Sequence, residues 1–246
     1  MKEFYSYCGG LPAPEYSDNP LRFKFSWSPR GALLSQRNSA QFLLNGKEVT
    51  IAAEDLMATA KPYFVADGYS FYAFPNRNSV PFREFYNIPE AETVIRGSLR
   101  YEGNPAFVAA LANIGWLDTD EKEWLREGLT WSEVHKNITG AANTDERQVF
   151  CVIVYFTNPF SVNVSTIIER IKEKCQFPNE TECARIISGL RWMGILGSEL
   201  ATVRGKSLLD TLCAQLEKLM SFQSGERDLV MLQHKFVVEW SDDKKV

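Results

Sequence analysis

The strongest constraint on the fold is a strand pattern near the C-terminus that follows a long helical region. Near the C-terminus the larger or apolar side chains occupy every second position: Val230, Leu232, His234, Phe236, Val238 and Trp240. This two-residue period is typical of a β-strand. Because one long strand is not stable alone, it must join a sheet built earlier in the chain. The fold is therefore expected to be discontinuous.

The region before this strand is patterned as helices from about Asn104. Two stripes repeat at helical spacing: Cys183, Ile186, Ile187, Leu190 and Met193, and then Leu209, Leu212, Cys213, Leu216 and Leu219. Stripes of this kind usually form the core of a helical bundle. The capping-box patterns at 118–121 and 130–133 predict two helix starts. We expect a helical domain over residues 104–224.

The first hundred residues favour strands mixed with short helices. The segments with strand character are FYSYC (ending at Gly9-Gly10), LRFKFSW, KEVTIAA, YSFYAF and ETVIRGSLRYEG. Ser28-Pro29 is typical of a helix start, and we expect that helix to include Phe42 and Leu43 and to end near Asn45-Gly46. The predicted fold class is α+β: a discontinuous domain with a mixed or antiparallel sheet, residues 1–103 and 225–246, and an inserted all-helical domain.

Composition excludes several classes of function. The net charge of −4 disfavours nucleic-acid binding, and no apolar run is long enough for a membrane span or a signal peptide. The five cysteines are odd in number and form no CxxC pair, which indicates reduced thiols and a cytoplasmic protein. The two histidines lie far apart, so no metal site is expected. We expect His234 to be a half-buried strand residue.

Two segments could contact a ligand through the backbone. In YCGGLPAPE the glycines allow close approach of a ligand, although a rigid turn explains them equally well. At Ser28 the first turn of a helix could hold an anion, although an ordinary N-cap has the same sequence. The sequence contains neither a GxGxxG nor a GxxxxGK[ST] phosphate loop, and no nucleophile elbow.

Three arginines lie on or near expected strand ends: Arg77, Arg96 and Arg100. Arginine binds a carboxylate through two parallel hydrogen bonds, so a cluster of arginines suits a ligand with several carboxylates. The alternative is a set of exposed ion pairs.

Several long segments together resemble one family. They are SYCGGLPAPEYSDNPLRFKFSWSPRGALL, LMATAKPYF, FPNRNSVPFREFYNIPEAETVIRGSLRYEG and GERDLVMLQHKF. They are similar, in the same order, to fungal saccharopine dehydrogenases (NADP-dependent, L-glutamate-forming). The resemblance implies an oxidoreductase of lysine biosynthesis. In that reaction NADPH reduces the imine formed from 2-aminoadipate 6-semialdehyde and L-glutamate, which gives saccharopine.

The resemblance also implies an organisation and a set of site residues. The family has an N-terminal Rossmann domain, a mixed domain that binds saccharopine and forms a homodimer, and a helical domain. This chain resembles the last two, so we expect it to bind NADP weakly and to be inactive alone. The matching positions are Ser28 for NADP, Arg77, Ser98, Leu99 and Arg100 for saccharopine, and Cys8 near the reacting carbon–nitrogen bond. Ser98 stands where relatives have threonine and keeps the hydroxyl.

Two other functions remain open at the level of sequence. The chain could be a non-catalytic ligand-binding or dimerisation module derived from the same enzyme, or part of a larger fusion enzyme. The sequence on either side of the chain distinguishes these cases.

One segment, VFCVIVYFTNPFS at residues 149–161, departs from the family pattern. Its removal joins Gln148 to VNVSTII, which restores the register with relatives that have QDIVSTIV. It is apolar and favours a strand within a helical region, and its residues are compatible with the codons of a short intron. We therefore interpret it as intron-derived, with a buried hairpin as the alternative.

Overall fold

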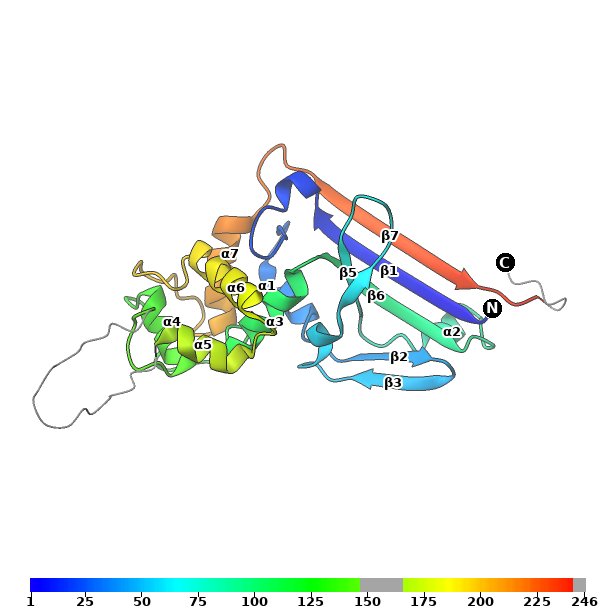
Figure 1. Ribbon diagram of the computed structural model, residues 1–246, viewed down its shortest axis with the longest axis horizontal. Helices are drawn as coiled ribbons and strands as arrows, with labels where there is room; N and C mark the ends of the chain where they lie inside the picture. The colour runs from blue at the N-terminus through cyan, green and yellow to red at the C-terminus, as the bar shows by residue number, and fades with distance from the viewer. Residues whose placement is uncertain (147–165, 241–246) are drawn as a thin grey trace, which may run out of the picture. The chain divides into compact units, whose positions relative to one another are not determined.

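The computed structural model describes residues 1–146 and 166–240 and separates into two compact units (Figure 1). One unit contains Met1–Ala109 and Met220–Val246, and the other contains Ala110–Leu219. The segment 149–161 lies outside the described residues, so its interpretation stays a prediction.

The first unit is organised around an open, mixed sheet. Its strands are β1 (Glu3–Pro12), β2 (Ala40–Leu44), β3 (Lys47–Ile51), β4 (Lys61–Tyr63), β5 (Phe71–Pro75), β6 (Thr93–Tyr101) and β7 (Asp228–Val237). The order is β3-β2-β6-β1-β7, and β5 pairs with both β4 and β6. β1 and β6 are parallel, whereas the other paired strands are antiparallel. The predicted α+β class is confirmed.

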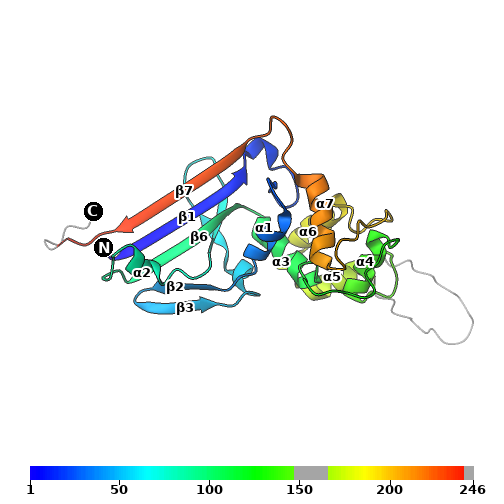
Figure 2. The same cartoon turned by 180° about the vertical axis from the view of Figure 1, so that it is seen from behind.

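The returning strand joins the sheet as expected. β7 runs antiparallel to β1 along its full length, from Glu3 opposite Val237 to Pro12 opposite Asp228. Figures 1 and 2 show β7, β1 and β6 side by side from both directions. β1 continues through Gly9-Gly10 to Pro12, so the strand does not end at the glycines as predicted.

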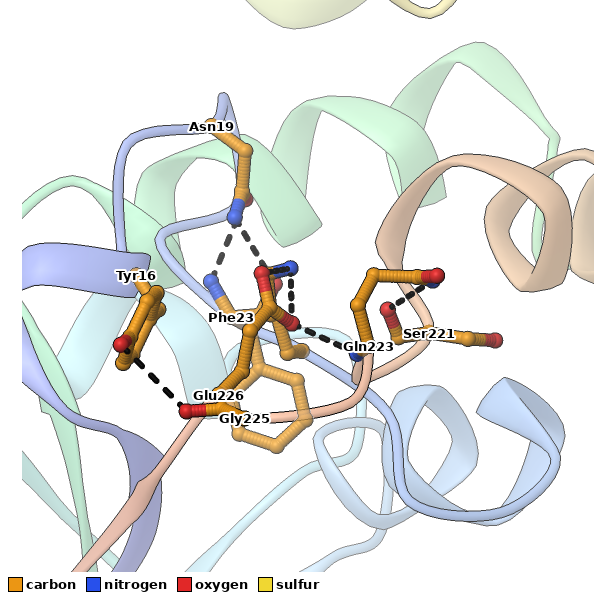
Figure 3. A network of polar contacts seen from close by, with 8 residues as sticks. Tyr16, Asn19, Phe23, Ser221, Gln223, Gly225 and Glu226 are labelled. Carbon is orange, nitrogen blue, oxygen red and sulfur yellow. Dashed lines mark hydrogen bonds and ion pairs between the residues drawn. The ribbon is translucent and has the colours of Figure 1, made fainter.

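A polar network fixes the segment that leads into β7 (Figure 3). The Glu226 carboxylate accepts hydrogen bonds from Lys24 Nζ and, at 2.7 Å, from the Gln223 backbone N–H. The Tyr16 hydroxyl donates to the Gly225 carbonyl at 3.5 Å. These contacts connect residues near the start of the chain with residues near its end, which stabilises the discontinuous unit.

The same network involves LRFKFSW, which forms no regular strand. The Asn19 side chain donates to the Phe23 carbonyl at 3.0 Å and accepts from the Phe23 N–H at 3.2 Å. An asparagine that hydrogen-bonds nearby backbone in this way competes with strand pairing. Phe25 makes only an isolated bridge with Ser221.

The helix predicted after Ser28 is shorter than expected. α1 comprises Pro29–Ser35, with Ser28 as its N-cap. Phe42 and Leu43 belong instead to β2, and Asn45-Gly46 is the hairpin turn between β2 and β3. Asn45 and Gly46 both have positive φ, 50° and 75°, as a tight hairpin turn requires. A further short helix, α2 (Phe82–Phe85), and two 3₁₀ turns, Pro14–Tyr16 and Leu56–Thr59, also belong to this unit.

The second unit is helical. Its elements are the end of α3 (Asn104–Ile114), α4 (Trp131–Thr139), α5 (Ile167–Cys175), α6 (Glu180–Trp192) and nearly all of α7 (Leu208–Met220). The two predicted stripes lie on or next to α6 and α7 and are buried, with Leu219 half-buried. Among the described residues no helix is long and apolar enough to cross a membrane.

One of the two predicted capping boxes is present. Thr130 caps α4 and exchanges hydrogen bonds with Glu133 in both directions. The prediction at 118–121 is wrong: the Asp118 carboxylate accepts from the Asp120 N–H at 2.8 Å in a turn, and no helix follows. A short-range turn and an N-cap use the same side-chain contact, so the sequence pattern does not separate them.

Candidate functional site

The parallel pair of β1 and β6 places two rows of side chains on one face of the sheet. Ser6 is the partner of Arg96, and Cys8 is the partner of Ser98. Since side chains alternate along a strand, Arg100 lies on this face as well. The opposite face carries a hydrophobic cluster that includes Tyr7, Leu11, Phe71, Ile95, Leu99 and Tyr101.

These rows border an open pocket of about 280 Å³. Its lining consists of Ser6, Cys8, Gly10, Ser35, Asn76, Arg96, Gly97, Ser98 and Arg100. The lining contains two cationic side chains and no carboxylate. A concave site of this charge attracts anions.

The Arg100 guanidinium is partly desolvated. One terminal nitrogen donates to the Leu99 carbonyl at 2.8 Å, and the group lies 5.1 Å from the centre of the Phe23 ring. Burial lowers the pKa of Arg100 to about 10, with Cys8 opposing part of that shift. Its Nε atom is buried and has no hydrogen-bond partner in the part of the chain that the structure describes. A charged group with an unused donor at a pocket is suited to a carboxylate ligand.

Arg96 is held differently. Its guanidinium carbon lies 3.8 Å from the centre of the Phe82 ring, and its backbone N–H donates to Ser79 Oγ at 3.0 Å. The Arg96 carbonyl accepts from the Asn76 N–H at 2.9 Å. Within residues 1–146 and 166–240, neither Arg96 nor Arg100 forms an ion pair.

The structure brings three of the predicted site residues together: Cys8, Ser98 and Arg100 line the pocket. Cys8 is an exposed free thiol. Leu99 lies between Ser98 and Arg100 in sequence, but its side chain is fully buried on the opposite face. Only the backbone of Leu99 can approach a ligand, and its carbonyl already accepts from Arg100.

Arg77 and Ser28 are not among the lining residues. Arg77 follows Asn76, has an exposed side chain and a φ of 52°, and its carbonyl accepts from the Gln41 N–H. Ser28 is exposed at the start of α1, where its Oγ accepts from the Arg30 N–H at 3.4 Å. Ser35, at the other end of the same helix, does line the pocket.

Sequence reasoning missed Ser6, Ser35, Asn76 and Gly97 as pocket residues, whereas Gly10 belongs to the YCGGLPAPE segment that it considered for close approach of a ligand. Alternation outward from Cys8 would have identified Ser6 and Gly10, because all three lie on one face of β1. Ser35 and Asn76 come from other segments, and no local pattern connects them to β1. His234, expected to be half-buried, is exposed on β7 next to the exposed Leu232 and Phe236.

Known proteins share both the sequence and the fold. The chain is 47% identical over 245 residues to saccharopine dehydrogenase (NADP(+), L-glutamate-forming) of Pyricularia oryzae, covering 100% of this chain and 50% of the relative. It is 48% identical to the Saccharomyces cerevisiae protein of the same name, covering 98% and 50%. The bovine mitochondrial alpha-aminoadipic semialdehyde synthase is 32% identical, with 96% and 23% covered.

A solved structure gives the same result. The apo histidine-tagged saccharopine dehydrogenase (L-Glu forming) from Saccharomyces cerevisiae superposes with a TM-score of 0.88 at 47% identity, covering 100% of this chain and 51% of that chain. The chain thus spans about half the length of the fungal relatives it matches. The family model for the saccharopine dehydrogenase C-terminal domain matches residues 1–246. This protein belongs to the saccharopine dehydrogenase C-terminal domain family.

Proposed function

We propose that this chain is the saccharopine-binding part of an NADP-dependent, L-glutamate-forming saccharopine dehydrogenase of lysine biosynthesis. The observation that carries the proposal is the pocket between β1 and β6, which has two arginines and no carboxylate in its lining. The identity with fungal relatives of that name over the whole chain supports it.

The proposed ligand has the chemistry that this pocket requires. Saccharopine carries three carboxylates and a central secondary amine. Each hydrogen bond between an arginine and a carboxylate contributes about 1.5–3 kcal/mol. Arg100 offers a desolvated cation with an unused N–H, and the Ser98 hydroxyl and Cys8 thiol lie beside it. We assign Arg77 a contact from the rim next to Asn76, and Leu99 a contact through its backbone.

The described residues do not fit a complete dinucleotide site. α1 has only seven residues, and the Ser28 hydroxyl oxygen accepts from the Arg30 N–H while its own O–H remains a donor. The sequence contains no glycine-rich phosphate loop. In this proposal Ser28 contacts an NADP molecule held mainly by residues outside this chain, and the chain alone is inactive. When bound, NADP supplies or accepts the hydride, and the residues of the pocket bind and orient the amino-acid ligand.

We also propose the domain limits 1–103, 104–224 and 225–246, a homodimer formed by the sheet domain, and a cytoplasmic location. The exposed Val230, Leu232 and Phe236 on β7 support a partner surface, because large apolar side chains on an edge strand are usually covered. The free thiols of Cys8, Cys175, Cys183 and Cys213 support a reducing compartment.

Two alternatives have specific support. A larger fusion enzyme is supported by the bovine synthase, of which this chain covers only 23%. A non-catalytic module is supported by the absence of a phosphate loop from the sequence. The higher identity with the fungal dehydrogenases favours the proposed enzyme.

The test is saccharopine-dependent formation of NADPH by the full-length protein. Arg77→Ala is expected to raise the Michaelis constant for saccharopine by about two- to fivefold, because water screens the contact of an exposed arginine at the rim. Arg126→Ala, which removes an exposed arginine of the helical unit, is the matched control and should leave the constant unchanged. A full-length protein that forms no NADPH would favour the non-catalytic module.

A further inference from the structure

Arg96 lines the pocket and contributes to its positive charge, but no contact with the ligand has yet been assigned to it. We infer that Arg96 is a second carboxylate-binding residue, positioned by Phe82. Together, Arg96 and Arg100 select a ligand with a carboxylate at each end. This inference rests on the proposed function and assigns opposite ends of the pocket to the two parts of saccharopine.

The strand geometry sets the distance between the Cα atoms of the two arginines. Arg96, Ser98 and Arg100 occupy alternate positions of β6 and line the same pocket. The Cα atoms of residues four apart in a strand are about 13 Å apart. Ser98 lies midway, with Cys8 as its direct partner on β1. Along β6 the pocket lining therefore begins and ends with an arginine, with two small polar residues between them.

The contact with Phe82 fixes the orientation of Arg96. The guanidinium carbon is 3.8 Å from the centre of the ring, the distance of a cation–π contact. The Phe82 ring is itself held by Phe85 and Tyr86, at centroid distances of 5.5 and 5.4 Å. A stacked guanidinium keeps its N–H donors in its own plane, free to bind a carboxylate in a pre-organised direction.

Only saccharopine, in which the two reactants are joined, has carboxylates about as far apart as the Cα atoms of Arg96 and Arg100. The most distant carboxylates of saccharopine are separated by about ten bonds, roughly 12 Å in an extended chain. The two carboxylates of L-glutamate are separated by about four bonds, roughly 5 Å, which is too short to span both arginines. The 2-aminoadipate 6-semialdehyde has a single carboxylate. Each reactant therefore binds at one end, and their amine and aldehyde groups meet near Ser98 and Cys8.

Straight-chain dicarboxylates of graded length test the spacing directly. Isothermal titration calorimetry of the full-length protein is expected to show the tightest binding for diacids whose carboxylates lie about 11–13 Å apart. Arg96→Ala should weaken binding of these long diacids about 10- to 100-fold and change binding of glutarate less than about twofold. Arg96→Lys, which keeps the charge but loses the planar fork, should give an intermediate loss. Arg126→Ala is the control.

Phe82→Leu tests the positioning role, because leucine keeps an apolar side chain without a ring. It is expected to weaken binding of long diacids about three- to tenfold, and to have no further effect in the Arg96→Ala background. An additive effect in that background would contradict the assignment of Phe82.

The outcomes separate this inference from the proposed function. If Arg96→Ala and Arg96→Lys bind long diacids as tightly as the unsubstituted protein, while Arg100→Ala weakens them, the role of Arg96 is wrong and the pocket stands. If Arg100→Ala also has no effect, the proposed saccharopine pocket fails. Equal melting temperatures of the variants exclude unfolding as the cause of any loss.

Discussion

Gly9 and Gly10 are consecutive residues of β1, so an added side chain would point to opposite faces of the sheet and meet different surroundings. A Cβ added to Gly9 would lie 3.0 Å from the Cβ of Leu99, whereas one added to Gly10 would meet nothing within 4 Å. The first glycine permits packing against the core, and the second leaves space in the pocket that it lines.

Gly10→Val is expected to interfere with ligand binding without unfolding the protein, because a Cβ at this position meets no atom within 4 Å. We expect the Michaelis constant for saccharopine to rise about tenfold, the effect of losing about 1.4 kcal/mol of binding. The free energy of unfolding should fall by no more than about 0.5 kcal/mol. Gly31→Ala in α1, which also meets nothing within 4 Å, is the control. An unchanged Michaelis constant in Gly10→Val would remove Gly10 from the pocket.

Gly97→Ala is expected to destabilise the sheet unit. An added Cβ would lie 2.3 Å from the Tyr7 ring and 2.7 Å from the Phe74 carbonyl oxygen, so the strand or the ring must move. Overpacking of this kind costs about 1–3 kcal/mol. Urea unfolding measures the loss, and Tyr7→Leu in the same chain should recover part of it. A Gly97→Ala variant as stable as the parent would contradict the close approach of Tyr7 and Phe74 to Gly97.

His135 makes the stability of the helical unit depend on pH. The residue is fully buried beside Trp116, whose Nε1 donates to His135 Nδ1 at 3.3 Å. Its Nε2 atom has no partner among the described residues. Burial lowers the pKa of His135 from 6.5 to about 3. The unfolded chain therefore binds one more proton than the folded chain between about pH 3 and 6.5.

The stability contributed by neutral His135 is complete above pH 6.5 and is lost as the pH falls toward 3. The expected slope in that window is about 1.4 kcal/mol per pH unit. Chemical unfolding at several pH values measures it. His135→Gln keeps an acceptor for Trp116 but does not titrate, so its slope should be smaller by that amount. Identical slopes for the two proteins would mean that His135 does not titrate on unfolding.

The elements that sequence reasoning identified are those with one dominant period. β7 alternates along its ten residues, and the two stripes span 11 residues each, 183–193 and 209–219, on or next to α6 and α7. The segment 40–44 is shorter and fits both a helix and a strand. This segment is a strand because the turn at Asn45-Gly46 that follows it is a hairpin turn. Two consecutive residues with positive φ are typical of a hairpin and not of a simple helix end.

The site was predictable only in part because it is assembled from distant segments. Cys8 and Ser98 become neighbours through the parallel register of β1 and β6, across 90 residues of sequence. The resemblance to a family supplied both residues and Arg100. Ser35 and Asn76 reach the pocket through the positions of α1 and β5, which depend on tertiary packing. The Arg96 guanidinium lies over the Phe82 ring, a contact that neither sequence pattern nor spacing reveals.

The affinity of the full-length protein for saccharopine, with and without Arg100→Ala, tests the central claim most directly. Isothermal titration calorimetry should show binding to the unsubstituted protein and a dissociation constant about 10- to 150-fold higher for the variant, because a desolvated charged hydrogen bond is lost. Equal dissociation constants in two proteins with the same melting temperature would contradict the assignment of the β1–β6 pocket as the saccharopine site.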